Sequence, residues 1–361
     1  MVYVAGTIKI ALTAEALNMV EAVGEFSRHR LIPAVYIIGK EKKKPVLVYV
    51  PAVSGQSLAH GYQEQLAKLA TMRGIKVCGL CQMGSFVKHG LPNIFLKDRV
   101  RDEYKILNRY DPNFVNFMEN LYNLVSNDNL KDAYRLMLEC VVEDIGGFLI
   151  PDLQLKRTSV VSFSYMVPVA RTLGDVQPQM YTRAGVQATR EHGQMIFHED
   201  LASALYHFAF GLDIQRVGRA ETPYGTVELP LAERLKRIEL ALDAFVPLID
   251  SLRFGAKKSR KNPLAELHSV AVTISHPLPF RPEAAFSTDY IAETVKRAIT
   301  VVNYLEDYGQ EIKIYYYTKY DEKPAGGNEN KVTVEEAENF VDLMKKVKEE
   351  ILKLYQEKEK S

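Results

Sequence analysis

The first apolar residues of the chain alternate with polar ones. In residues 3–13, Val4, Ile8, Ile10 and Leu12 share one side of a two-residue period, and the other side is mixed. This alternation is typical of a strand whose two faces are packed differently. We therefore predict that the chain opens with a strand.

Further β-rich runs follow. Residues 35–38 and 46–50, on either side of the charged stretch 39–44, predict a hairpin, whereas residues 18–30, with Gly24 and a basic end, predict a loop. Later patterns predict a continuous strand at 155–168, a hairpin at 179–197, and strands at 203–212, 267–274 and 312–317.

Helices are indicated by caps and by apolar stripes. Ser54 is a natural N-cap for a helix that runs to about Arg73. An apolar stripe predicts a helix over 231–249, and Thr288 or Asp289 is the predicted cap of a helix that runs to about Tyr304. Residues 333–336 have the form of a capping box before a last helix, whose short apolar seam favours packing on the chain's own core.

The order of these elements predicts an α+β fold. It fits a sandwich with helices on one face of an antiparallel sheet, the plan shared by RNA-recognition-motif-like and ferredoxin-like folds. Residues 74–130 mix glycine, proline, asparagine and aspartate with aromatic residues, so we predict an insertion with short helices there.

Composition excludes several classes of protein. The 361 residues are 47% hydrophobic and 25% charged, which is typical of a globular chain. No apolar run is long enough to span a bilayer, and the N-terminus lacks the order of a signal peptide. We expect a cytoplasmic protein with no membrane partner.

The net charge is only +1, but the basic residues are clustered. One cluster lies at 28–44, and five of the nine residues at 253–261 are Lys or Arg. Gly255 lets the backbone turn and a ligand approach closely, and Ser259 adds a hydroxyl donor. A solvated basic turn is the simpler interpretation of this loop alone, and a phosphate site is the alternative.

Two other segments are rich in hydrogen-bond donors. The start of the helix at Ser54 offers free N–H groups to an anion, and Gln56, Ser57 and His60 can share a face there. A partly buried, satisfied histidine is the alternative for His60. Residues 156–159 supply further donors within the predicted strand.

The chain has three cysteines: Cys78, Cys81 and Cys140. An odd number without a secretory signal argues against a disulfide framework. The CxxC spacing can bind zinc, with His89 and Cys140 as conceivable further ligands, but a second CxxC or an HxxxH is missing. The default is a pair of small, partly buried residues, and we predict no metal and no cofactor.

A series of motifs in order then resembles a known family. They are VEAVG at 20–24 with SRHR at 27–30, YVPAVSG at 49–55 with LAH at 58–60, DIGGF at 144–148, KRTS at 156–159, YMVP at 165–168, ASALY at 202–206, FG at 254–255 with KKSR at 257–260, and PFRPE at 279–283. Over about residues 3–305 the chain resembles the archaeal backbone subunits of type I-A CRISPR Cascade complexes, in the DevR-like branch of the RAMP superfamily.

The resemblance implies a fold shaped like a hand. It implies an RNA-recognition-motif-like palm at 1–73 and 140–330, a helical fingers insertion at 74–139, a β-hairpin thumb at 174–200, and a C-terminal helix at 331–361. It also implies a head-to-tail filament of copies along the CRISPR RNA spacer, with other Cascade subunits as partners and with bases left open to pair with target DNA.

A spacer has arbitrary sequence, so such a protein must hold the sugar-phosphate backbone and leave the base edges free. Met166 or Tyr181 could wedge between bases, although core packing is the simpler role for Met166. The predicted RNA-binding residues are Arg28, His29, Arg30, Ser54, Gly55, Gln56, Ser57, His60, Lys156, Arg157, Thr158, Ser159, Met166, Arg183, Phe254, Gly255, Lys257, Lys258, Ser259 and Arg260.

Three other functions compete with a non-catalytic scaffold. An endoribonuclease that processes CRISPR RNA would use His29, His60 and Tyr62, the one plausible local acid–base set, and the first loop lacks the aspartate of target-cleaving relatives. A DNA-binding autoregulator would need a recognition helix, and no helix-turn-helix pattern is evident. A zinc-dependent module would be built on Cys78 and Cys81. We predict no enzymatic activity.

Overall fold

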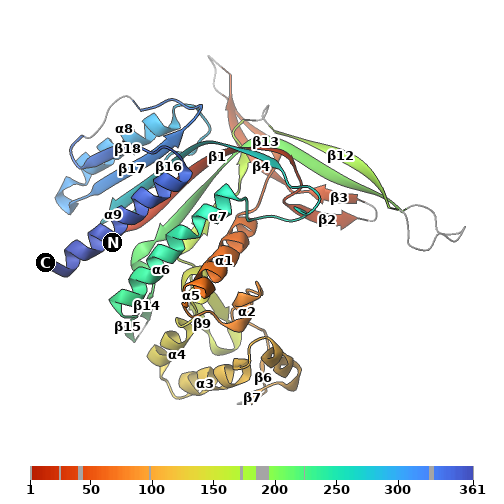
Figure 1. Ribbon diagram of the computed structural model, residues 1–361, viewed down its shortest axis with the longest axis vertical. Coiled ribbons are helices and arrows are strands. Elements are labelled where there is room, and N and C mark those ends of the chain that lie inside the picture. The colour runs from red at the N-terminus through yellow and green to blue at the C-terminus, as the bar shows by residue number, and fades with distance from the viewer. Residues whose placement is uncertain are drawn as a thin grey trace, which may run out of the picture.

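The computed structural model describes residues 2–23, 26–39, 44–96, 99–170, 174–183, 195–222, 224–324 and 329–360. A large twisted sheet forms its centre, in the strand order β18-β17-β16-β1-β13-β3-β2. Strands β10, β11 and β12 also pair with β13, which therefore organises much of the sheet (Figure 1). Most neighbours are antiparallel, whereas β13–β3 and β17–β18 are parallel.

The strands have the following bounds: β1 Tyr3–Glu15, β2 Met19–Val23, β3 Phe26–His29, β4 Leu31–Ile38, β5 Lys44–Pro51, β6 Phe95–Leu96, β7 Arg99–Val100, β8 Phe148–Ile150, β9 Leu155–Arg157, β10 Val161–Phe163, β11 Val167–Pro168, β12 Gly174–Arg183, β13 Met195–Asp213, β14 Arg219–Thr222, β15 Gly225–Glu228, β16 Leu264–His276, β17 Glu311–Thr318 and β18 Val332–Glu336.

The helices have the following bounds: α1 Gly55–Met72, α2 Gly79–Gln82, α3 Phe114–Ser126, α4 Leu130–Met137, α5 Val141–Gly146, α6 Leu231–Asp243, α7 Phe245–Asp250, α8 Tyr290–Tyr304 and α9 Phe340–Lys360, with the 3-10 helix η1 at Asp102–Arg109. No helix of the described residues is both long and apolar enough to cross a membrane.

The opening strand behaves as its sequence predicts. Val4, Ile8, Ile10 and Leu12 lie in the main hydrophobic core, and α1, α6, α7 and α9 cover that face of the sheet. The last helix places its seam in the same core, so the prediction that it packs on its own chain is confirmed. Burial of these side chains is the main stabilising term of the fold.

The prediction that all helices cover one face is wrong. On β16, Val270 and Val272 join the main core, whereas Ala271 packs in a separate cluster with Tyr290 of α8. Successive side chains of a strand point to opposite faces, so α8 covers the second face. Buried residues lie on both faces of β16, so other elements must pack against both faces.

Three other predictions are also wrong. Residues 18–30 were expected to be a loop but form β2 and β3, because β3 completes its hydrogen bonds on the distant strand β13. The strand expected at 155–168 is broken into β9, β10 and β11. Residues 333–336 are not a helix cap, because they form β18 beside β17.

Two hairpins project from the sheet. Strands β4 and β5 pair from Leu31↔Pro51 to Ile38↔Lys44, as the sequence predicts, and the tip at 40–43 lies outside the described residues. Strands β12 and β13 pair from Gly174↔Ala204 to Arg183↔Met195 and form a long ribbon that leaves the body (Figure 1). The strand expected at 203–212 is the inner half of β13.

The insertion after α1 has a core of its own. Its helices and short strands bury Phe114, Met118, Leu121 and Met137 in a cluster distinct from the main core. In Figure 1 it lies at the far end of α1 from the sheet. The short helices predicted for this segment are present as α2, α3 and α4.

Candidate nucleic-acid interface

The basic loop at 253–261 lies against the first turns of α1. Residues from three distant parts of the chain, among them Asn18, Ser57, His60, Arg253 and Lys258, line one groove of about 490 Å³. The structure thus brings together two of the segments that the sequence singled out as possible phosphate sites.

Close backbone contacts hold this loop in place. A Cβ at Gly61 of α1 would lie 2.2 Å from the carbonyl oxygen of Arg253, so only glycine lets helix and loop approach so closely. Gly255 has a φ of +80°, and a Cβ there would meet the side chain of Leu17 at 2.7 Å. The N–H of Ala256 donates to the carbonyl of Leu17 at 2.9 Å. The loop is therefore a fixed wall of the groove.

The start of α1 forms as predicted. The side chain of Ser54 accepts a hydrogen bond from the N–H of Ser57, and the N–H of Ser54 donates to Asn18 Oδ1 at 2.9 Å. Gln56 and His60 are exposed, whereas Ser54 is buried in its capping role. Nε2 of His60 lies 3.4 Å from Glu64 Oε1. Gln56 and His60 are therefore accessible to a ligand, and His60 lines the groove.

The cations of the loop differ in their partners. Lys257 and Lys261 both pair with Glu199 of β13, and Lys258 donates to the carbonyl of Leu252. Arg253 and Arg260 are exposed, and neither has an acidic partner among the described residues. Partial burial lowers the pKa of Lys257 and of Lys258. Among the described residues, the two arginines and Lys258 are therefore the cations of this loop without an acidic partner.

Strand β3 carries the other basic cluster to the same region. Glu199 lies opposite Ser27 in the parallel β3–β13 ladder, so the carboxylate that holds Lys257 adjoins the strand containing Arg28. Arg28 is exposed. The clusters at 28–30 and 253–261 thus converge around β13.

His29 has a structural role in this strand. Its side chain is buried, with Nε2 2.6 Å from Glu15 Oε1, and Tyr206 donates to the same carboxylate oxygen at 2.7 Å. Burial acts to lower the pKa of His29, but the hydrogen bond and charge of Glu15 outweigh it, and the pKa is raised. This imidazole is not available to a phosphate, so the predicted RNA contact by His29 is corrected.

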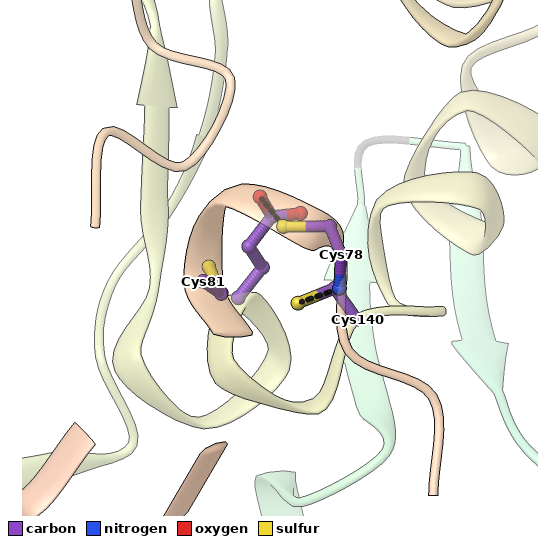
Figure 2. A group of neighbouring side chains, drawn as sticks. Cys78, Cys81 and Cys140 are labelled. Carbon is purple, nitrogen blue, oxygen red and sulfur yellow. Dashed lines mark hydrogen bonds between the residues drawn. The ribbon is translucent and has the colours of Figure 1, made fainter. Parts of the chain in front are cut away.

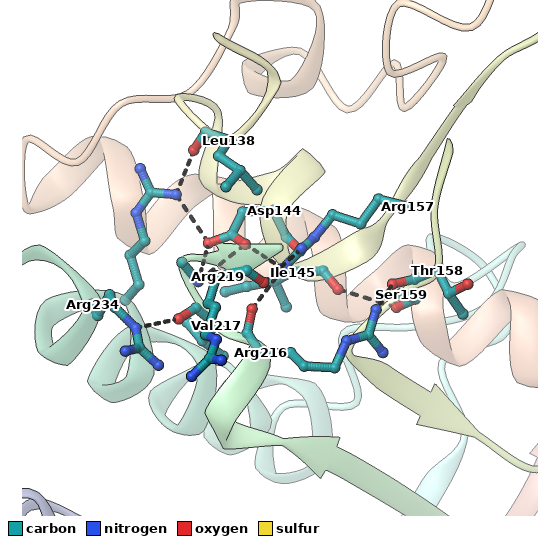
Figure 3. Close-up of polar contacts among 12 residues, drawn as sticks. Leu138, Asp144, Ile145, Arg157, Thr158, Ser159, Arg216, Val217, Arg219 and Arg234 are labelled. Carbon is teal, nitrogen blue, oxygen red and sulfur yellow. Dashed lines mark hydrogen bonds and ion pairs between the residues drawn. The ribbon is translucent and has the colours of Figure 1, made fainter. Parts of the chain in front are cut away.

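Arg157 is also a structural residue. Figure 3 shows its guanidinium enclosed by Asp144 and by the segment at 216–219. It donates to Asp144 Oδ1 at 2.7 Å and to the carbonyls of Asp144, Arg216 and Arg219. A guanidinium with every nitrogen engaged and little exposure cannot hold a phosphate, which corrects the prediction for Arg157.

Asp144 is the centre of this buried network. Arg237 donates to its second oxygen, Oδ2, at 3.0 Å, and the N–H of Gly218 donates to the same oxygen at 2.9 Å. Burial raises the pKa of Asp144, while the charges of Arg157 and Arg237 act in the opposite direction. The network ties α5 and β9 to α6 and to the chain before β14.

Several of the remaining predicted residues differ in their exposure. Met166 and Phe254 are buried in the main core, so the core role favoured for Met166 is the correct one, and Phe254 only adjoins the groove from the core side. Ser159 donates to backbone carbonyls, whereas Lys156, Thr158 and Ser259 are exposed. The backbone of Arg183 pairs with that of Met195, and the side chains of Arg183 and Tyr181 lie outside the described residues.

Gly55 and Arg30 are constrained by the backbone around them. A Cβ at Gly55 would lie 2.5 Å from the carbonyl oxygen of Phe163, so this glycine allows α1 to begin against β10. The main chain of Arg30 bonds to Asn18 and Ala52, and its side chain is half-buried.

Sequence reasoning missed Asn18 and Lys68, which line the groove, and it placed Arg253 in the basic loop without naming it as an RNA contact. Asn18 lay in a segment expected to be a loop. Lys68 lies two turns beyond His60 on α1, and helical spacing alone could have placed both on one face.

The acid–base set proposed for a nuclease does not assemble. Tyr62 is fully buried and donates to the carbonyl of Ala241 at 2.7 Å, and His29 is held by Glu15. Of these three side chains, His60 alone is exposed.

Comparisons with known proteins place the chain in a family. The family model described as "CRISPR-associated negative auto-regulator DevR/Csa2" matches residues 6–295. The chain belongs to the DevR/Csa2 family. The resemblance drawn from the sequence motifs is confirmed.

Two curated DevR/Csa2 relatives come from Saccharolobus solfataricus. "CRISPR-associated protein Cas7/Csa2 1" is 30% identical over 84% of this chain and 87% of its own length. "CRISPR-associated aCascade subunit Cas7/Csa2 2" is 30% identical over 81% of this chain and 86% of its own length. The matches extend over most of both chains.

Solved structures share the fold of this DevR/Csa2 chain. A chain of a "CRISPR RNA-guided surveillance complex, pre-nicking" matches with a TM-score of 0.51 and 12% identity, over 96% of this chain and 99% of that one. A chain of a "CRISPR RNA-guided surveillance complex" matches with a TM-score of 0.50 and 11% identity. The mixed α+β fold predicted from the sequence is confirmed.

Proposed function

We propose that this DevR/Csa2 chain is a backbone subunit of an RNA-guided CRISPR surveillance complex. It holds the sugar-phosphate backbone of the CRISPR RNA and leaves the bases free to pair with target DNA. One observation carries the proposal: the groove between α1 and the basic loop, where a helix N-terminus, Ser57 and His60 meet the exposed cation Arg253.

The chemistry of this groove suits a phosphodiester chain. The first turn of α1 supplies N–H groups and the positive end of a helix dipole, both of which favour an anion. Arg253 in the groove, and Arg260 farther along the same loop, supply forked donors that match phosphate geometry. Contacts of this kind do not depend on base identity, as a spacer of arbitrary sequence requires.

The strand order supports the hand-like division of the chain. Strands β10, β13, β1 and β16 are neighbours in that order, α1 follows β1, and α6 follows β13, which is the ferredoxin-like arrangement of an RNA-recognition-motif-like palm. We assign the palm to 1–73 and 140–330, the fingers to 74–139, the thumb to 174–200 and the C-terminal helix to 331–361. Strand β18 extends the palm sheet slightly past this last boundary.

The β4–β5 hairpin supports assembly with copies of the chain. Leu31, Ile37, Leu47 and Tyr49 are each more than half exposed on it, at 51%, 62%, 62% and 71%. Exposed apolar side chains gathered on one hairpin are typical of a protein interface. The neighbouring copy in a filament is the partner that the proposed function provides, and other complex subunits cap its ends.

The subunit acts without catalysis in this proposal. The exposed member of the acid–base set is His60, which has Glu64 beside it and no second acid–base partner from that set. Its role is to donate to a phosphate.

Nuclease footprinting of the protein assembled on two CRISPR RNAs with unrelated spacers tests the proposal. We expect both RNAs to be protected in the same regular pattern and to remain uncut by the protein. Fixed-position cleavage would favour the endoribonuclease, and the absence of RNA affinity would refute the proposal. A control variant with Lys105→Ala and Arg109→Ala, two cations that do not line the groove, should give the same protection pattern as the wild type.

A further inference from the structure

A second cluster of side chains lies at the base of the insertion, independent of the RNA groove. Cys78, Cys81, Cys140 and Glu143 each place one ligand atom within 4.8 Å of all the others. Figure 2 shows the three cysteines gathered at the turn that contains α2 and at the chain entering α5. All three are free thiols in this structure. Ligand atoms of a tetrahedral zinc site with Zn–S bonds of about 2.3 Å lie about 3.8 Å apart, which is compatible with this spacing.

The burial of this cluster favours a bound cation. Cys81 and Cys140 are 0% and 5% exposed, and Glu143 is 0% exposed. Oε2 of Glu143 has no hydrogen-bond partner within the described part of the chain. A carboxylate oxygen buried without a partner is costly, and a metal ion would satisfy it.

The surrounding groups resemble the outer shell of a metal site. Nδ1 of His89 lies 2.5 Å from Glu143 Oε1, and the histidine ring is stacked on Phe117. The backbone N–H of Cys78 donates to Cys140 Sγ at 3.4 Å. Cys78 Sγ lies 4.0 Å from the same Glu143 oxygen, Oε1. A histidine that holds a carboxylate fixes its orientation toward the other ligands, and an N–H donor to a sulfur stabilises the thiolate form.

We propose that Cys78, Cys81, Cys140 and Glu143 bind one structural zinc ion, with His89 as the residue that positions Glu143. Three thiolates select a soft or borderline ion, and four protein ligands close the coordination shell against water. Binding releases the three thiol protons, and Glu143 binds as the carboxylate. Lys88, whose Nζ donates to the carbonyl of Gly146 at 2.7 Å, is a nearby cation that offsets the negative charge of this ligand set.

The position of the ligands gives the ion a structural task. Cys78 and Cys81 stand at the start of the insertion at 74–139, and Cys140 and Glu143 stand just after its end. The zinc ion would therefore join the two ends where they meet α1 and α5. Closing a loop of this length in the unfolded chain removes a substantial amount of conformational entropy, which stabilises the folded insertion.

The sequence favoured no metal because a second CxxC was missing. Its place is taken by Cys140, which precedes α5, and by Glu143, which enters from the first turn of that short helix. Sequence spacing could not pair these residues with Cys78, because folding of the insertion brings them together.

Elemental analysis of the full-length protein, purified without added metal, tests the proposal. We expect about one zinc ion per chain, and less than about one tenth of that in Cys81→Ser and Cys140→Ser. Glu139→Gln, which changes an exposed carboxylate beside Cys140, is the matched control and should retain the ion. His89→Ala should weaken zinc affinity by about 10- to 100-fold without removing a ligand.

The wild-type protein provides a second measurement if the cysteine variants fail to fold. Exchange of zinc for cobalt(II) should give thiolate-to-cobalt charge-transfer absorption, and a chelator should make residues 79–139 more sensitive to protease than residues 231–250. Metal-free protein with three titratable thiols, a disulfide between two of them, or zinc retained equally by the cysteine variants would each overturn the proposal.

Discussion

Two groups of cations in this molecule differ in what surrounds them. At the Asp144 network, Arg157 and Arg237 are buried and bound to one carboxylate, and they hold secondary-structure elements together. In the basic loop at 253–261, Arg253 and Arg260 are exposed, and Lys257 and Lys261 share a single glutamate. A basic residue is therefore a candidate for RNA binding only after its internal partners are known.

Among the substitutions considered, one in the buried Asp144 network should have the largest effect. Asp144→Ala leaves two buried guanidinium groups without their counter-charge, so we expect the free energy of unfolding to fall by about 3–5 kcal/mol. Denaturant titration measures it. The control, Glu221→Ala, breaks an exposed pair with Arg219 and should change the free energy of unfolding far less. Equal effects of the two substitutions would contradict the structural role of Asp144.

Substitutions of the exposed arginines of the basic loop should change RNA binding and leave stability almost unchanged. Arg253→Ala combined with Arg260→Ala should leave the free energy of unfolding within about 0.5 kcal/mol of the wild type, because both side chains are exposed. The log–log slope of RNA affinity against salt should become shallower by about 0.7 for each phosphate that the variant no longer neutralises. Fluorescence anisotropy at several salt concentrations measures the slope, and an unchanged slope would remove this loop from the interface.

A substitution at Glu199 should have a smaller effect on RNA affinity, and it should raise the affinity. Glu199→Gln removes the carboxylate that pairs with Lys257 and Lys261, so the ammonium group of Lys257 becomes available to phosphate. We expect RNA to bind a few-fold more tightly, by roughly 1 kcal/mol, with a steeper salt dependence. The same substitution at Glu266, an exposed partner of Lys319, is the control. Weaker RNA binding by Glu199→Gln would contradict this prediction. It would show that the main effect of Glu199 is to hold the basic loop in its conformation, and not to neutralise the charge of its lysines.

The smallest effect concerns pH and the buried pair of His29 and Glu15. The folded-state pKa of His29 is raised, so protonation favours the folded form. This contribution is fully present below the unfolded-state pKa of about 6.5 and is lost as pH rises through the folded-state pKa. The difference in unfolding free energy between wild type and His29→Gln should therefore shrink as pH rises. A difference that grew with pH would contradict the ion pair.

Elements marked by alternation or by a capping residue in their own sequence could be predicted. The alternation of residues 3–13 identified β1 and its core face, and Ser54 identified the start of α1. Strands β2 and β3 could not be predicted, because β3 depends on hydrogen bonds to β13, far along the chain.

The candidate site was predicted only in part, because some of its contacts join residues that are far apart in the sequence. Glycine and basic residues at 253–261 were visible in the sequence, but their packing against α1 through Gly61 was not. Burial of Arg157 had one local signal, because the two-residue period of β9 places it on the same side as the buried Leu155. No local signal could show that His29 pairs with Glu15, since the two belong to different strands.

Ultraviolet cross-linking of the assembled protein to its CRISPR RNA, with the linked peptides identified by mass spectrometry, tests the central claim most directly. We predict cross-links from the first turns of α1, near Ser57 and His60, and from residues 253–261, for spacers of any sequence. Cross-links confined to the insertion at 99–139, or found for one spacer sequence and not for another, would contradict this role of the groove.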